Sequence, residues 1–206
     1  MDKYITIENN ASTDIIEKKS RFIGQTFYVE SVEKAEEILK QIKKKYYDAR
    51  HNCYAYRILE DGNILQRSSD DGEPSSTAGA PILNVLEKNN LVNVLIIVTR
   101  YFGGILLGTG GLVKAYSESA SRAIEKSGII EKKLGVLMKV ILNYSELEGF
   151  YYFCRKRNII IEKEEFLDRV MLYIKISYEN AEILIKKRQE LSFKIIKIDV
   201  IQEIYV

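Results

Sequence analysis

The chain is poor in the residues that build metal centres and disulfide frameworks, with one histidine and two cysteines among 206 residues. Cys53 and Cys154 lie far apart, and neither belongs to a C-x-x-C motif. This spacing argues against a zinc motif and against a disulfide scaffold. We therefore assign no metal ligand and no cofactor from the sequence.

Long apolar runs and an excess of one charge are also missing. The opening MDKYITIENN has no apolar signal segment, and the strongly apolar runs are too short to span a bilayer. Lysine and arginine total 31 against 29 acidic residues, so the net charge does not predict nucleic-acid binding, although a local basic patch stays open. The apolar content of 46% is ordinary for a globular protein, which we expect to be cytoplasmic and without a membrane partner.

The chain does contain two halves with different patterns. Residues 1–130 mix predicted strands and helices with many glycines, and the apolar run NVLIIVTR at 93–100 predicts a strand covered on both faces. Residues 134–206 have almost no glycine and predict the order β-α-β-β-α-β, which is the ferredoxin-like pattern. We therefore predict an α+β protein of two domains, 1–130 and 134–206, with a polar linker at 125–133.

Local signals mark the ends and faces of several elements. Ser31 precedes an amphipathic pattern and is predicted to cap the N-terminus of a helix. Ser145 and Glu148 have the spacing of a capping box at the start of another helix. Apolar and polar residues alternate in the last strand, which predicts three core-facing residues, Ile196, Ile198 and Val200.

The stretch YFGGILLGTGG, residues 101–111, joins the apolar strand to a predicted helix. It is not a Walker A loop, because Thr109 stands where a lysine must follow Gly108, and it is not a dinucleotide fingerprint, because Val113 replaces the third glycine. Two interpretations stay open. The backbone N–H groups, with Lys114 one turn into the helix, cradle an anion, or the glycines only make a tight connection.

The stretch SSDDGEPSSTAGAP, residues 68–81, places three carboxylates among turn-forming residues. Asp70, Asp71 and Glu73 could together hold a magnesium ion through oxygen ligands. Alternatively, they accept hydrogen bonds from backbone N–H groups in a tight turn, which is the commoner role of such acids. We expect a helix to begin soon afterwards, between Thr77 and Pro81.

The only histidine lies two residues before a cysteine on a predicted strand. His51 and Cys53 therefore point to the same face of that strand. Neighbours at this spacing lie about 7 Å apart, too far for a direct hydrogen bond between nucleophile and base. Packing or a polar contact is predicted for both side chains rather than catalysis.

Four segments resemble the YigZ/IMPACT family in order and spacing: RFIGQ, HNCYAYRI, SSDDGEPSSTAGAPIL and NVLIIVTRYFGGILLGTGGLVKAYS. The resemblance covers about residues 18–127. It implies an N-terminal domain like the second domain of small-subunit ribosomal protein five and, as in bacterial members, a C-terminal ferredoxin-like domain. The chain has Ser76 where the family usually has glycine, and a serine is strained if the backbone there needs a positive φ. It has Lys114 where arginine is common, which keeps the charge without the bidentate geometry.

The resemblance also implies a general function, which is binding associated with translation. Eukaryotic IMPACT proteins are similar to regulators of translation that compete for a ribosome-associated activator of an initiation-factor kinase. Bacteria lack that kinase pathway, so the partner of the eukaryotic proteins cannot be assigned to this chain. We expect a non-enzymatic binding protein whose partner is the ribosome, RNA or a translation-associated protein. The alternative is a phosphate-ligand-binding protein or an enzyme that uses the two stretches, and a homo-oligomer stays open.

The two stretches are predicted to pack beside each other at one end of the first domain's sheet. The acids of one would accept N–H bonds from the other, and Arg100 would pair with one of the three acids. Tyr101 and Phe102 are expected either under the loop or exposed to a partner. No catalytic residue is assigned. The predicted binding surface comprises Arg21, His51, Cys53, Asp70, Asp71, Gly72, Glu73, Pro74, Thr77, Gly79, Arg100, Tyr101, Phe102, Gly103, Gly104, Gly108, Thr109, Gly110, Gly111 and Lys114.

Overall fold

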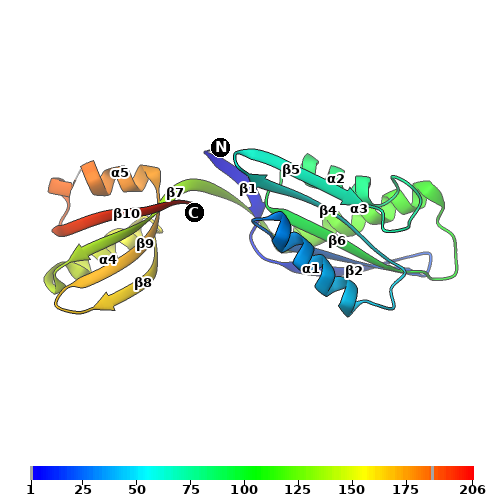
Figure 1. The fold of residues 1–206 in the computed structure, drawn as a ribbon, viewed down its shortest axis with the longest axis horizontal. Coiled ribbons are helices and arrows are strands. Elements are labelled where there is room, and N and C mark those ends of the chain that lie inside the picture. The colour runs from blue at the N-terminus through cyan, green and yellow to red at the C-terminus, as the bar shows by residue number, and fades with distance from the viewer. Residues whose placement is uncertain (1, 187) are drawn as a thin grey trace. The chain divides into compact units, whose positions relative to one another are not determined.

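The computed structural model describes residues 2–186 and 188–206 and has two compact units (Figure 1). One unit is formed by residues 4–131, and the other by residues 132–206 together with Asp2 and Lys3. This division of the structure into two units does not test the predicted domain limits, 1–130 and 134–206, which remain a prediction. None of the described helices is both long and apolar enough to cross a membrane.

The first unit is built on a five-stranded antiparallel sheet in the order β2-β3-β6-β4-β5. The strands are β2 (Ala11–Glu17), β3 (Ser20–Tyr28), β4 (His51–Glu60), β5 (Asn63–Ser69) and β6 (Val94–Tyr101). Helix α1 (Val32–Lys45) covers one face, and α2 (Gly79–Lys88) and α3 (Gly108–Ser127) cover the other (Figure 1). The sheet is therefore the middle layer of three.

Strand β6 lies at the centre of this sheet, and its side chains enter two different cores. Val94, Ile96 and Val98 pack in the cluster under α2 and α3. Leu95 and Ile97 pack in the cluster under α1. The prediction of a strand covered on both faces is confirmed, and the reason is the period of two along a strand.

The helices of this unit begin close to the predicted residues. The Ser31 side chain accepts a hydrogen bond from the Lys34 backbone N–H at 3.2 Å, so the predicted cap of α1 is confirmed. Helix α2 begins at Gly79, inside the predicted range of Thr77 to Pro81. Helix α3 begins within the glycine-rich stretch itself, at Gly108.

The second unit has the ferredoxin-like order of elements. These are β7 (Ile129–Leu142), α4 (Leu147–Lys156), β8 (Ile160–Phe166), β9 (Val170–Ser177), α5 (Tyr178–Lys186) and β10 (Ile195–Tyr205), with short 3₁₀ turns at Tyr144–Glu146 and Arg188–Glu190. The strand order is β10-β7-β9-β8, all antiparallel, and β1 (Lys3–Ile7) also pairs with β7. The α+β class and the β-α-β-β-α-β pattern are thus confirmed.

Residues 125–133, predicted as a polar linker, contain the end of α3 at Ser127 and the start of β7 at Ile129, and the division between the two units falls inside this stretch. Two other local predictions were wrong. No side chain caps α4, since a 3₁₀ turn precedes it and Ser145 instead contacts Glu146.

The expected alternation in β10 also fails, since Ile196 and Val200 are 37% and 56% exposed and only Ile198 packs against the core. The register shift between residues 195 and 197 takes Ile196 out of the alternation, whereas Val200 stays opposite the buried Met138, on the core side of the sheet, and is nevertheless exposed.

One close approach fixes how α3 lies on the sheet. A Cβ atom at Gly24 of β3 would lie 2.5 Å from the backbone oxygen of Ser119. We expect Gly24→Ala to lower the free energy of unfolding by about 1–3 kcal/mol, because the helix must move away from the strand. Urea unfolding measures this. Gly110→Ala is the matched control, since the same atom meets nothing within 4 Å there. Equal effects of the two substitutions would contradict the close-approach explanation.

Candidate functional site

The site lies at the end of β6, on the sheet face that α2 and α3 cover. Val94, Ile96 and Val98 point to that face, so Arg100, two residues further on, points there as well. The register places His51 of β4 opposite Arg100 and Cys53 opposite Val98. A cation, an imidazole and a thiol are thereby brought to one face by strand geometry alone.

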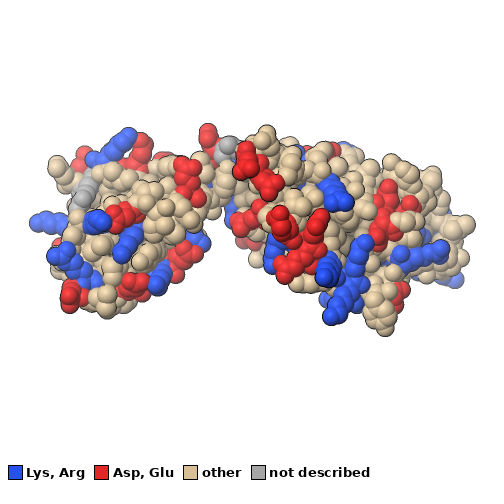
Figure 2. All heavy atoms as spheres, in the orientation of Figure 1, with Lys and Arg blue, Asp and Glu red and all other residues tan. Residues whose placement is uncertain are grey.

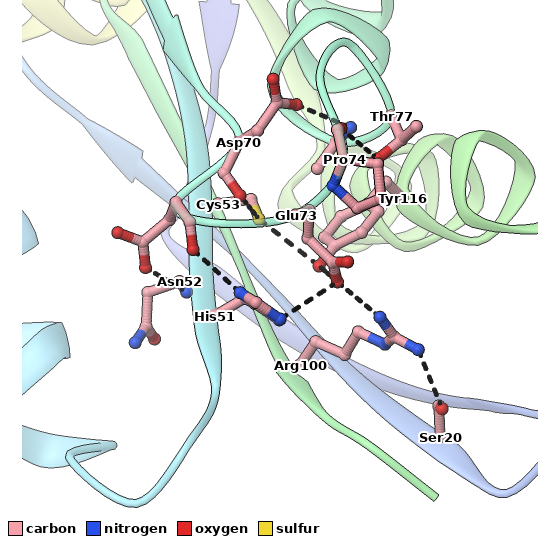
Figure 3. Close-up of polar contacts among 12 residues, drawn as sticks. Ser20, His51, Asn52, Cys53, Asp70, Glu73, Pro74, Thr77, Arg100 and Tyr116 are labelled. Atoms are coloured by element: carbon pink, nitrogen blue, oxygen red, sulfur yellow. Dashed lines mark hydrogen bonds and ion pairs between the residues drawn. The ribbon is translucent and has the colours of Figure 1, made fainter. Parts of the chain in front are cut away.

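Glu73 is the centre of this group (Figure 3). Arg100 Nη1 donates to Glu73 Oε1 at 2.6 Å, and the Tyr116 hydroxyl donates to the same oxygen at 2.8 Å. His51 Nε2 lies 3.9 Å from it. Only 3% of the Glu73 side chain and 7% of the Arg100 side chain are exposed. The expected pairing of Arg100 with one of the three acids is confirmed, with Glu73 as the partner.

Asp70 organises the start of α2. Its carboxylate accepts hydrogen bonds from the backbone N–H groups of Ser76 and Ala78 at 2.9 Å and of Gly79 at 2.8 Å. Burial alone would raise the pKa of Asp70, but these backbone donors outweigh it and lower the pKa. Asp70 therefore acts as a remote N-cap for a helix that no adjacent side chain caps.

Asp71 ties the same turn to strand β4 and helix α1. Its carboxylate accepts from the Asn52 backbone N–H and from the Lys43 ammonium, both at 2.7 Å. Its carbonyl oxygen lies 2.8 Å from His51 Nδ1. Because a carbonyl only accepts, Nδ1 carries the hydrogen, and Nε2 is the nitrogen that faces Glu73. Asp70 and Asp71 thus accept from backbone N–H groups, as in the commoner of the two roles considered for the acids, whereas the Glu73 carboxylate accepts from the side chains of Arg100 and Tyr116.

The glycine-rich stretch is anchored in another way than expected. The acids accept no recorded hydrogen bond from residues 101–111 within the described chain, so that prediction was wrong. The Gly103 N–H instead donates to Ser20 Oγ at 3.2 Å, and Arg100 Nη2 lies 3.4 Å from the same oxygen. A Cβ at Gly103 would lie 2.0 Å from the Lys19 carbonyl, so the tight-connection interpretation accounts for this glycine.

Cys53 is a packed and inert thiol. Its side chain is fully buried, and Sγ donates to the Asp70 carbonyl oxygen at 2.9 Å. Burial raises the pKa of Cys53 to about 12 and also raises the pKa of its neighbour Tyr116. Neither group ionises at neutral pH, and the Cys53 side chain is packed between Asp70 and Tyr116.

A cavity of about 410 Å³ opens above the ion pair, and both stretches line it. They therefore lie side by side at one end of the sheet, as predicted. Charged and polar groups at its floor are those of His51, Glu73 and Arg100. The lining also includes a cation, Arg50, and a hydroxyl, Thr109, and is otherwise apolar or glycine: Gly72, Pro74, Phe102, Leu106, Leu107, Gly108 and Leu112.

The other residues of the predicted surface lie outside this lining. Arg21 pairs with Asp14 and lines a separate hollow with Tyr46 and Arg122. The Tyr101 hydroxyl donates to Asp48 at 2.8 Å. The remaining members hold the two stretches in place or are exposed beside the cavity: Cys53, Asp70, Asp71, Thr77, Gly79, Gly103, Gly104, Gly110, Gly111 and Lys114.

Sequence reasoning missed residues that come from distant parts of the chain. Tyr116 and Ser20 complete the buried cluster, and Leu106, Leu112 and Arg50 line the cavity. Tyr116 and Leu112 lie within the last family-like segment, so the extent of that segment was a usable signal. Ser20 and Arg50 directly precede two other family-like segments, RFIGQ and HNCYAYRI, but their contacts depend on strand pairing, which the sequence alone does not show.

Fold and site together define a two-domain α+β protein with a buried ion cluster under a loop-lined cavity. The Impact N-terminal domain matches residues 18–124, and the chain belongs to the IMPACT family. The IMPACT family member YvyE of Bacillus subtilis is 38% identical over 82% of this chain and 78% of its own length.

Two solved structures extend the comparison. A hypothetical protein of known crystal structure is 28% identical, with a TM-score of 0.64 and coverage of 98% of both chains. The two-domain translational regulator Yih1 is also 28% identical, over 58% of this chain and 46% of its own, with a TM-score of 0.36. With the family match, the first unit has the expected fold, which is like the second domain of small-subunit ribosomal protein five.

Ser76 carries a backbone strain that the family glycine would not have. Its φ is +61°, in the left-handed region that costs an L-residue about 1–2 kcal/mol. We expect Ser76→Gly to raise the free energy of unfolding by about 0.5–1 kcal/mol, after the greater entropy of the unfolded chain is subtracted. Ser75→Gly is the matched control, because residue 75 has no positive φ, and it should destabilise slightly. Urea midpoints that fall in both variants would contradict this account.

The buried ion pair between Glu73 and Arg100 predicts how substitutions at these residues change stability. Glu73→Leu leaves the Arg100 charge buried without its partner, so we expect a loss of about 3–5 kcal/mol in unfolding free energy. The double variant Glu73→Leu with Arg100→Met should lose much less, because neither charge remains. Glu118→Leu, which removes the exposed partner of Arg122, is the control and should change stability by less than about 1 kcal/mol. Additive losses in the double variant would show that the charges are not the cause.

Proposed function

We propose that this protein is a non-enzymatic binding protein associated with translation, and that it acts in the cytoplasm through the cavity and the loops around it. Membership of the IMPACT family is the observation that carries this proposal. We infer a role in translation from the family resemblance, because eukaryotic members are similar to regulators of translation. The proposed partner is the ribosome, an RNA or a translation-associated protein.

The chemistry of the site supports binding over catalysis. The thiol nearest to the cavity floor belongs to Cys53, and burial raises its pKa to about 12. Arg100 is neutralised by Glu73 at 2.6 Å, and Tyr116 donates to the same carboxylate. A cluster that satisfies its own charges stiffens the loops above it, which lowers the entropy cost when they bind a partner.

The alternative, a phosphate-binding protein or enzyme, is supported less well. The N-terminus of α3 does border the cavity through Gly108 and Thr109, and helix N-termini favour anions. However, Arg100 is already paired with Glu73 and Lys114 lies outside the cavity lining, which leaves Arg50 as the lining cation without an ion-pair partner among the described residues. Phosphoryl transfer needs a metal, free cations and a positioned base together, and the described residues contain no group of three potential metal ligands.

Co-sedimentation with ribosomes over a series of salt concentrations tests the proposal. We expect association at low salt, and Leu106→Asp should weaken it at least about tenfold, because a charge would enter an apolar contact. Leu106 is 82% exposed, so the change should leave folding intact. Steep salt dependence would indicate contacts with RNA phosphates.

The matched control is Leu167→Asp, the same change at a leucine that is 66% exposed in the second unit. It should leave association unchanged. Wild-type protein that stays in the supernatant at every salt concentration would overturn the proposed function. Equal effects of the two aspartates would place the contact elsewhere on the chain.

A further inference from the structure

We propose that the cavity and its exposed rim bind a polypeptide segment with one large apolar side chain flanked by acidic residues. This inference rests on the proposed function and narrows its partner to a protein. Four features of the first unit carry it: the lining of the cavity, its rim, a glycine without an internal role, and the surrounding charges.

The lining suits an apolar side chain. Phe102, Leu106, Leu107 and Leu112 contribute aliphatic and aromatic surface, and the volume is about 410 Å³. The polar groups at the floor are those of Glu73, Arg100 and His51, and the charges of Glu73 and Arg100 neutralise each other. Water in such a space makes few hydrogen bonds, so its replacement by an apolar side chain is favourable.

The rim of the cavity exposes more apolar surface than a solvated loop requires. Leu106 is 82% exposed, Ile105 and Phe102 are each 41% exposed, and Val113 is 38% exposed. Contiguous exposed apolar residues mark sites of protein interaction. Most of them are aliphatic, whereas binding of single-stranded RNA depends on aromatic side chains that stack on bases. The rim therefore favours a polypeptide.

Gly110 has no role that the chain itself explains. Its φ is not positive, and an added Cβ would meet nothing within 4 Å. A glycine in a helix costs about 1 kcal/mol relative to alanine. Gly110 shares the exposed face of the first turns of α3 with Val113 and Lys114. A glycine at such a position allows another molecule to approach the backbone closely.

The charges around the cavity are complementary to acidic residues. Arg50 lines the cavity, Lys114 follows Val113, and neither has an ion-pair partner among the described residues. Basic residues also fill the last turn of α1, where Lys43 reaches Asp71, and Figure 2 shows basic side chains over that end of the helix. Acidic flanks on a peptide would meet this positive rim while its apolar side chain enters the cavity.

The test uses the full chain and a synthetic peptide, acetyl-Asp-Glu-Leu-Glu-Asp-amide, followed by amide chemical shifts. We expect saturable shifts at residues 105–113, with a dissociation constant of about 0.1–1 mM, as suits a five-residue ligand. A peptide with serine in place of leucine, and one with lysines in place of the acids, should each bind at least about tenfold more weakly. Oligouridine is the competing probe.

The substitution Gly110→Leu tests whether this glycine is needed for binding or for the stability of the fold. Leucine is the better helix former, so the melting temperature should stay or rise while peptide affinity falls at least about tenfold. Ser121→Leu is the matched control, because it adds the same side chain at an exposed position of α3 outside the cavity lining. It should leave peptide binding unchanged.

The inference would be overturned by the absence of shifts with the leucine peptide, or by equal peptide binding of Gly110→Leu and wild type. Shifts at residues 105–113 with oligouridine alone would assign the surface to RNA and would also overturn it. Co-sedimentation with ribosomes is measured on the same preparations. If it persists while peptide binding fails, the proposed function stands and only the protein partner is wrong.

Discussion

The ion pair between Glu73 and Arg100 is the contact on which the loop end of the first sheet depends. It joins the turn after β5 to the end of the central strand, and Tyr116 of α3 donates to the same carboxylate oxygen. Three elements from different parts of the chain thus meet at one buried atom. Because an unpaired charge is costly in this environment, the turn cannot leave the strand without a large loss of stability.

The stiffness of this cluster explains why residues 68–81 and 101–111 can be rich in turn formers and still hold a defined shape. Asp70 caps α2, and Asp71 fastens the turn to β4. The carboxylates that looked available for a metal or ligand are used to order the backbone. What remains for a partner is the cavity above them and its apolar rim. Buried polar residues hold the loops in place, and the exposed residues of the rim are apolar.

Much of the fold could be predicted because local patterns agreed with the tertiary structure. The Ser31 cap, the covered strand β6 and the β-α-β-β-α-β order all follow from periodicity and capping, which act over a few residues. Predictions failed where long-range pairing shifted a local pattern. In β10 the register shift between residues 195 and 197 turns Ile196 outward, and no property of the strand itself marks this shift.

For the site, the sequence by itself determined which residue types gather: three acids in a turn, glycines before a helix, and an arginine at the end of a buried strand. It also determined the family, through segments whose order is specific. Only the tertiary structure decided that Glu73, rather than Asp70 or Asp71, pairs with Arg100, and that Ser20 and Tyr116 complete the cluster. The reason is physical: strand register and helix placement set these distances, and both depend on contacts between residues far apart in the chain.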